Sequence, residues 1–206
     1  MESTARKPKG HVWKEIVSPI LALVVICGAM SFALAMTNEM TAPLIEENTR
    51  KAAEEARAAL LPEADGFVQL EITAEVPGVT ALWGATNDAG YVVECYGTGG
   101  YGGDIPAMVA FTPEGTIVGV VYLQNNETPG LGKKLESDPS FAAQFTGLPA
   151  DPVQTDQIDK IASSTISTNA AIAAVNAAIE LYNQEIHGQS VDALAAASGQ
   201  GEGAEE

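Results

Sequence analysis

A run of 21 residues without a charge lies near the start of this 206-residue chain and limits how the chain can fold. Residues 16–36 read IVSPILALVVICGAMSFALAM and are almost wholly apolar. As a helix rising about 1.5 Å per residue, they span about 30 Å, the hydrocarbon thickness of a bilayer. Pro19 falls in the first turn, where a missing N–H costs little. The run therefore predicts a single transmembrane helix.

The charges on the two sides of this run differ in sign. The basic residues Arg6, Lys7, Lys9 and Lys14 precede it, whereas Glu39, Glu46 and Glu47 follow it. Basic flanks of a membrane helix stay in the cytoplasm. Residues 1–15 are therefore predicted to be cytoplasmic, and the remainder of the chain is predicted to lie on the other side of the cell membrane.

A cleaved signal peptide is the alternative interpretation of the same run. Ala33-Leu34-Ala35 resembles the small residues of a cleavage site. The apolar part of a signal peptide is about 7–15 residues long, however, and this run is longer. We therefore favour a helix that stays in the mature protein as a membrane anchor.

The composition excludes several kinds of partner and site. The chain has 27 acidic and 10 basic residues, a formal net charge of -17. Such a surface repels nucleic acid and anionic lipid headgroups, so no nucleic-acid partner is expected. The two cysteines, Cys27 and Cys95, and the two histidines, His11 and His187, are far apart in sequence. Neither a disulfide framework nor a metal site is predicted.

The chain beyond the anchor alternates between helical and strand-like segments. Residues 37–62 predict a connecting helix in which Pro43 takes an early position and Pro62 ends the helix. Residues 66–125 contain short β-branched or aromatic runs separated by Gly and Pro, namely FVQLEIT, YVVECY, MVAFT and TIVGVVYL. The last two runs predict a hairpin with a turn at Pro113-Glu114-Gly115.

Residues 126–158 predict loop and short helix, followed by a helix from about 167 to 187. On that helix Ile172, Val175, Ile179 and Ile186 fall near one face. The order of elements predicts an α+β domain over residues 63–190 with a mainly antiparallel sheet. The acidic tail, residues 191–206, has no apolar periodicity and predicts disorder.

Two segments contain more glycine than packing requires. YGTGGYGGDI (96–105) has five glycines in ten residues but lacks the lysine and the context of nucleotide-binding loops. Taken alone it favours a tight connection, although glycine also permits close approach of a ligand. NNETPGLGKKL (125–135) contains the turn dipeptide Pro129-Gly130 and, taken alone, favours a surface turn.

A third segment, DKIASSTISTNAA (159–171), contains five hydroxyl side chains. Ser167, Thr168 or Asn169 is predicted to cap the last helix. The other hydroxyls come just before the helix, where free N–H groups and the helix dipole favour negative charge. This is a suitable place for a phosphate. A serine nucleophile is not predicted, because no histidine is near in sequence.

Together the three segments resemble a known family. The chain resembles the G subunit of the Rnf ion-translocating ferredoxin:NAD oxidoreductases. Five segments carry the resemblance, in this order: the anchor, GYGGDIPAMVAFTPEGTIVGV, ETPGLGKKL, the hydroxyl segment and AVNAAIE. The C subunit of the Na⁺-translocating NADH:quinone reductases is a related protein. ETPGLG is the most family-specific of these pieces, and the resemblance covers nearly the whole chain.

The resemblance implies a covalent cofactor. In the family, a flavin transferase attaches FMN by its phosphate to the last threonine of a pattern close to Asp-x-x-Ser/Thr-Gly-Ala-Thr. DKIASST matches this pattern at Asp159 and Thr165, and departs from it at Ala162, Ser163 and Ser164. The resemblance thus implies a phosphoester bond between FMN and Thr165.

The resemblance also implies that the isolated chain does not complete a substrate turnover of its own. The chain is expected to relay electrons through its FMN to or from other subunits while the complex moves Na⁺ or H⁺, and no catalytic side chain is expected. The residues expected near the flavin are Asp159, Ser163, Ser164, Thr165, Ser167, Thr168, Gly99, Gly100, Gly102, Gly103, Glu127, Thr128, Pro129, Gly130, Leu131 and Gly132.

Three alternatives remain open from the sequence. The chain is the FMN subunit of an NADH:quinone reductase, a stand-alone membrane-anchored flavin carrier, or an assembly subunit whose altered motif takes no flavin. Flavin fluorescence of the denatured protein separates the last of these from the others.

Overall fold

The computed structural model describes residues 17–187. The predicted cytoplasmic segment 1–15 with its basic residues and the predicted tail 191–206 lie outside the described residues. The chain divides into two units, residues 1–52 and residues 53–206, and each is described by itself.

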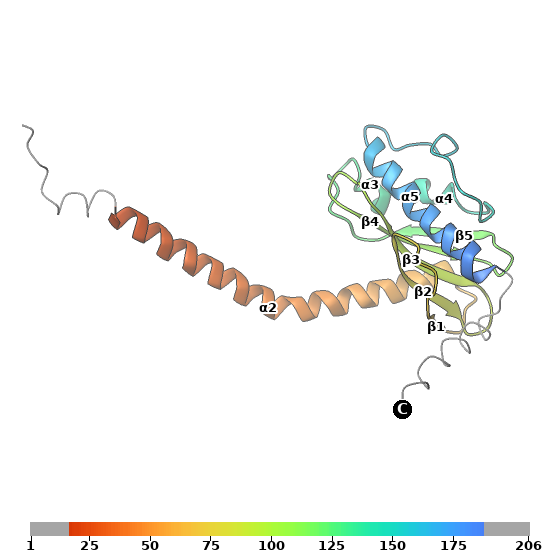
Figure 1. The fold of residues 1–206 in the computed structure, drawn as a ribbon, viewed down its shortest axis with the longest axis horizontal. Coiled ribbons are helices and arrows are strands. Elements are labelled where there is room, and N and C mark those ends of the chain that lie inside the picture. The colour runs from red at the N-terminus through yellow and green to blue at the C-terminus, as the bar shows by residue number, and fades with distance from the viewer. Residues whose placement is uncertain (1–16, 188–206) are drawn as a thin grey trace, which may run out of the picture. The chain divides into compact units, whose positions relative to one another are not determined.

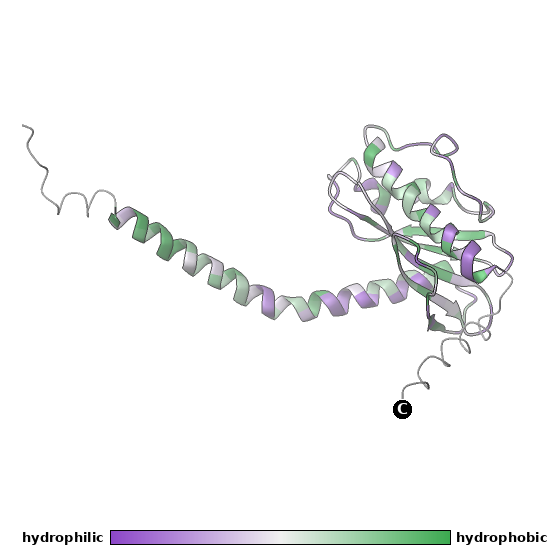
Figure 2. Cartoon of the chain, viewed as in Figure 1, coloured by the Kyte–Doolittle hydropathy of each residue, from purple (hydrophilic) through white to green (hydrophobic). Residues whose placement is uncertain are grey.

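The first element is the long helix α2, Ser18–Leu60. It is the one helix among residues 17–187 that is long and apolar enough to cross a membrane. Its N-terminal half is hydrophobic and its second half alternates between polar and apolar residues (Figure 2). The predicted connecting helix, residues 37–62, is helical as far as Leu60, but it continues the apolar segment in one helix, with Pro43 inside α2 rather than at a helix start. The helix ends before Pro62, since a residue that precedes proline avoids helical geometry.

The second unit contains a five-stranded sheet with the strands in sequence order (Figure 1). The strands are β1 (Phe67–Leu70), β2 (Val79–Ala85), β3 (Tyr91–Gly97), β4 (Ile105–Phe111) and β5 (Ile117–Tyr122). Every neighbouring pair is antiparallel. The predicted α+β class, the antiparallel sheet and the hairpin at residues 113–115 are therefore confirmed.

Strand β2 has no counterpart among the predicted runs. Its sequence, VTALWGA, contains two alanines and a glycine, which have low strand propensity. It is a strand because it pairs on both sides, with Leu70 opposite Leu82 on one side and Val93 opposite Leu82 on the other. Pairing with two neighbours thus decides its structure.

Four helical segments follow the sheet: α3 (Lys134–Ser137), α4 (Pro139–Ala143), α5 (Thr165–Leu181) and the π-helical turn η2 (Tyr182–Ile186). The predicted last helix, 167–187, therefore begins two residues early, and its end is π-helical. The predicted apolar face is confirmed, since Ile172, Val175, Ile179 and Ile186 are all buried.

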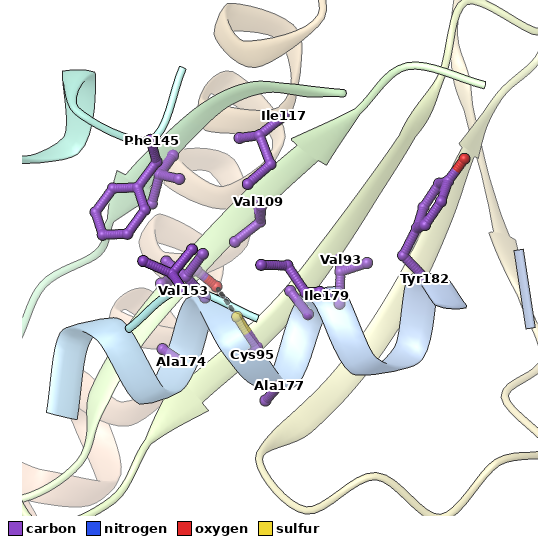
Figure 3. Packing of buried hydrophobic residues seen from close by; sticks show 14 of the residues in the cluster. Val93, Cys95, Val109, Ile117, Phe145, Val153, Ala174, Ala177, Ile179 and Tyr182 are labelled. Atoms are coloured by element: carbon purple, nitrogen blue, oxygen red, sulfur yellow. Dashed lines mark hydrogen bonds between the residues drawn. The ribbon is translucent and has the colours of Figure 1, made fainter. Parts of the chain in front are cut away.

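Helix α5 covers one face of the sheet, and the main core lies between them. Figure 3 shows Ile179 of α5 beside Val93 of the sheet, and Ala174 and Val109 belong to the same cluster of buried residues. Alanines on α5 let it approach the sheet closely. A Cβ on Gly97 at the end of β3 would lie 1.7 Å from the carbonyl oxygen of Ala170, so the close contact requires glycine there.

The other face of the sheet packs against the last turns of α2. Because side chains alternate along a strand, Val93 points to α5 while Val92 joins Leu60 and Leu61 in a second cluster. Arg57 is buried in this region, where its guanidinium pairs with Glu94 and lies 3.9 Å from the ring centroid of Trp83.

We expect Arg57→Met to lower the free energy of unfolding of the domain by about 3 kcal/mol, because the substitution leaves the partly buried Glu94 carboxylate unpaired. Methionine keeps much of the apolar stem that packs on Trp83. The measurement is denaturant unfolding followed by tryptophan fluorescence. Glu94→Gln in the Arg57→Met background should recover part of the loss, and additive losses in the double variant would contradict the pairing.

Candidate functional site

A pocket of about 510 Å³ opens beside the N-terminal end of α5. Three segments that are distant in sequence line it: the glycine-rich connection between β3 and β4, the loop after β5, and the start of α5. The lining residues are Tyr101, Glu127, Thr128, Leu131, Gly132, Ser163, Ser164, Thr165, Ile166 and Ser167. The structure therefore brings together the three segments that the sequence singled out.

The carboxylate of Glu127 connects these three segments. Glu127 is only 5% exposed. One carboxylate oxygen accepts a hydrogen bond from the backbone N–H of Gly102 at 2.8 Å, and the other accepts one from the Ser167 hydroxyl at 2.6 Å. Glu127 also lies near the positive end of the α5 dipole, which favours a negative charge.

Two glycines make room for this carboxylate. A Cβ on Gly132 would lie 2.3 Å from a Glu127 carboxylate oxygen and 2.7 Å from the Ser167 hydroxyl oxygen. A Cβ on Gly102 would lie 2.1 Å from the carbonyl oxygen of Asn126. Both positions therefore exclude larger residues, because the backbone approaches the carboxylate and its loop too closely for a side chain.

The start of α5 differs from the predicted one. Ser164 is the N-cap residue, so the prediction that Ser167, Thr168 or Asn169 caps the helix is wrong. Ser167 instead bonds to Glu127, and the Thr168 hydroxyl donates to the Ser164 carbonyl at 2.8 Å. The Ser167 hydroxyl thus makes a tertiary contact instead of a cap, whereas the Thr168 hydroxyl bonds to the carbonyl four residues earlier.

Ser163 adopts a backbone conformation that is unusual for its residue type. Its φ is 63°, in the left-handed region where a Cβ is strained and glycine is not. The family pattern has glycine at this position. Serine in place of glycine at position 163 thus strains the backbone two residues before Thr165.

We expect Ser163→Gly to raise the free energy of unfolding by about 0.5 kcal/mol, because relief of the strained φ exceeds the greater chain entropy of glycine in the unfolded state. Thermal unfolding of the two proteins measures the difference. Ala162→Gly, at a neighbouring residue whose φ is not positive, is the matched control and should lower stability. A loss of stability in Ser163→Gly would contradict the strain.

The pocket has an apolar rim. Beyond α2, the exposed large apolar residues of the described chain are Tyr101, Leu131 and Ile166, at 76%, 39% and 57% exposure. All three line the pocket. Tyr101 and Ile166 were not predicted as site residues, although each lies inside a segment that the sequence had singled out. Thr165 is also exposed, at the first position of α5.

Several predicted residues do not line the pocket. Thr168 is buried in the next turn of α5. Six others belong to the two glycine-containing loops but lie outside the lining: Gly99, Gly100, Gly102, Gly103, Pro129 and Gly130. Gly102 nevertheless contributes through its N–H bond to Glu127.

Asp159 lies in a neighbouring hollow together with Asp138, Lys134 and Lys160. Gln144 holds the backbone there, because its side-chain amide accepts from the Asp159 N–H at 2.8 Å and donates to the Asp159 carbonyl at 3.2 Å. Hydrogen bonds from Ser140 hold the pKa of Asp138 below its usual value. The two ends of the Asp159–Thr165 pattern therefore lie in different hollows.

The pocket suits FMN in size and chemistry. Its volume lies within the range of small-molecule sites, about 300–1,000 Å³. The apolar rim suits a flat aromatic ring, and the N-terminal end of α5 suits a phosphate. Ser164, Thr165 and Ser167 would hold the phosphate end, whereas Tyr101, Leu131 and Ile166 would contact the ring.

Comparisons with known proteins agree with this chemistry. A family model described as an FMN-binding domain matches residues 100–180, which contain all three pocket segments. A relative from Acetobacterium woodii, the G subunit of a Na(+)-translocating ferredoxin:NAD(+) oxidoreductase complex, is 31% identical over 82% of this chain and 93% of its own length.

Two further relatives have similar names. The G subunit of an ion-translocating oxidoreductase complex from Methanosarcina acetivorans is 31% identical over 84% of this chain and 97% of its own. The G subunit of a proton-translocating ferredoxin:NAD(+) oxidoreductase complex from Clostridium ljungdahlii is 28% identical over 77% of this chain and 86% of its own length. With its FMN-binding domain and its candidate membrane helix, this chain belongs to the family of G subunits of ion-translocating oxidoreductase complexes.

Proposed function

We propose that this chain relays electrons through an FMN bound covalently to Thr165, between other subunits of a membrane complex that moves Na⁺ or H⁺. The observation that supports this most directly is the position of Thr165. It is exposed at the first position of α5 and lines a pocket whose size and walls suit FMN. Bound there, the flavin would supply the electron-carrying chemistry.

The chain's own residues would bind and orient the cofactor. The three exposed apolar side chains would pack on the ring, and Glu127 would keep the two loops and the start of α5 together. A fixed pocket keeps the distance to a redox partner constant. The protein thus contributes position and surroundings, and no side chain is assigned a catalytic role.

Attachment would require a flavin transferase. In that reaction the Thr165 hydroxyl oxygen forms an ester bond to the flavin phosphate of a flavin dinucleotide. The anhydride P–O bond breaks, the nucleoside monophosphate leaves, and the hydroxyl proton passes to solvent. Because Asp159 lies in a neighbouring hollow, we assign it to recognition by the transferase rather than to holding the flavin.

The names of the relatives favour a ferredoxin:NAD oxidoreductase complex over a quinone reductase for this chain. We further propose that α2 stays in the mature protein, with residues 1–15 in the cytoplasm and the FMN domain outside it. Protease added to whole cells should then degrade the domain. A domain that the protease does not reach would indicate the opposite orientation.

The test of the function uses the full chain co-produced with a flavin transferase. The denatured protein band should fluoresce as flavin, and mass mapping should find one FMN phosphoryl group on the peptide that contains Thr165. A band without fluorescence, obtained while a known acceptor in the same cells is flavinylated, would favour an assembly subunit without flavin.

A further inference from the structure

The exposed apolar side chains of the domain gather at one place. Outside α2, the large apolar residues that the described chain leaves exposed are Tyr101, Leu131 and Ile166. They come from three separate segments, the β3–β4 connection, the loop after β5 and the first turn of α5, and all three line the pocket. Exposed apolar side chains that cluster in this way mark a contact with another molecule.

The basic side chains of the domain belong to two of the same segments. In residues 53–187, acidic residues outnumber basic ones several-fold, and the basic ones are Arg57, Lys133, Lys134 and Lys160. Arg57 is buried and paired within the domain. The three lysines lie in residues 125–135 and 159–171, which also supply two of the apolar rim residues. Positive charge on this acidic domain is therefore concentrated next to the apolar rim.

Two of the lysines are available to a partner. Lys133 is not, because its ammonium group lies 2.8 Å from the Glu136 carboxylate and 2.7 Å from the Asn125 carbonyl oxygen. Lys134 and Lys160 are exposed and line the hollow beside the pocket. Neither takes part in the ion pairs that the structure shows among residues 17–187. Their ammonium groups can therefore pair with carboxylates of another protein.

The hollow also contains two carboxylates, Asp138 and Asp159. Asp138 is engaged within the domain, since it accepts from the Ser140 N–H at 3.0 Å and caps α4. With two cations and two anions the hollow is close to neutral, whereas the chain as a whole is strongly acidic. An acidic protein that approaches the domain thus meets the least repulsion at the hollow and the apolar rim.

We propose that the apolar rim, together with Lys134 and Lys160, is the surface on which a redox partner subunit docks. The partner brings an apolar patch to the rim and carboxylates to the two lysines, the usual arrangement of an apolar centre within a polar border. That the partner is a redox protein rests on the proposed function, because a relay must bring its cofactor close to the next one. The net charge of -17 argues against an anionic lipid surface as the occupant.

The test measures binding of the full chain in detergent to the complex purified from cells that lack this chain. Biolayer interferometry follows the binding at low and at high salt, and fluorescence of the denatured protein gives the flavin content of every variant. Tyr101→Ala and Ile166→Ala should each weaken binding about tenfold, because truncation of a central apolar contact costs about that factor. Both residues are exposed, so the melting temperature should change little.

Lys134→Glu combined with Lys160→Glu should also weaken binding about tenfold, mainly through slower association, and this loss should shrink at high salt. Glu114→Lys is the control, because it reverses an exposed charge in the hairpin whose Pro113 carbonyl binds the Tyr182 hydroxyl, just beyond the C-terminal end of α5. This variant should change the affinity less than about twofold.

An affinity that either the two apolar variants or the lysine variant leaves unchanged would overturn the proposal. Weaker self-association of the chain in these variants, without loss of binding to the complex, would also overturn it, because a second copy of this chain would then be the occupant. Binding that the variants weaken in a chain without flavin would refute the proposed relay alone. Intact binding of flavin-carrying variants would refute the docking surface alone.

Discussion

Thr165→Val should abolish covalently bound flavin while the domain keeps its fold. Valine retains the β-branched shape at an exposed first position of α5, but it has no hydroxyl oxygen to form the phosphoester. Flavin content, measured by fluorescence of the denatured band after co-production with a flavin transferase, should fall from stoichiometric to background. The melting temperature should change little, since surface substitutions usually alter stability by less than about 0.5 kcal/mol.

The other hydroxyls of the segment serve as controls. Ser163→Ala, Ser164→Ala and Ser167→Ala should each retain flavin, and Ser167→Ala should do so more slowly because it removes a partner of Glu127. Asp159→Ala should reduce attachment without loss of stability, because the Asp159 backbone, rather than its side chain, holds the loop. Flavin that persists on Thr165→Val, or that maps to Ser163 or Ser164, would overturn the assignment.

Glu127→Ala should lower the free energy of unfolding by about 3 kcal/mol, one of the largest losses expected from a single substitution in the domain. The change leaves the Gly102 N–H and the Ser167 hydroxyl without their acceptor and opens a void between the loops. Denaturant unfolding measures the loss. Hydrogen exchange should accelerate at Gly102 and at the start of α5, because both segments lose the contact that joins them.

Glu127→Gln is the matched control, because glutamine keeps the shape of the side chain and removes its charge. Its amide oxygen can still accept from Gly102 and its amide group can donate to Ser167, so about 1 kcal/mol of stability should be lost. Glu136→Ala removes the carboxylate of an ion pair whose side chains are 33% and 34% exposed, and should cost less than about 1 kcal/mol. Equal losses for Glu127→Ala and Glu136→Ala would show that Glu127 does not join the three segments.

The sequence alone determined those elements whose structure depends on residues that are adjacent along the chain. The apolar run predicted the N-terminal part of α2 because its length and lack of charge suffice for the prediction, and Pro113-Glu114-Gly115 predicted the β4–β5 hairpin. The three unusual segments were also visible, since glycines and hydroxyls in excess of packing needs stand out in any local window.

Only the tertiary structure decided how those segments meet. Strand β2 follows from pairing on both sides rather than from its own residues. Ser164 is the N-cap residue of α5, and Ser167 bonds to Glu127 instead of capping the helix. Glu127 and Ser167 are 40 residues apart in sequence, so no local pattern reveals their bond. The separation of Asp159 from Thr165 into two hollows has the same origin, because the side-chain amide of Gln144, 15 residues earlier in the chain, bonds to the Asp159 backbone. Sequence patterns report neighbours along the chain, whereas a pocket depends on neighbours in space.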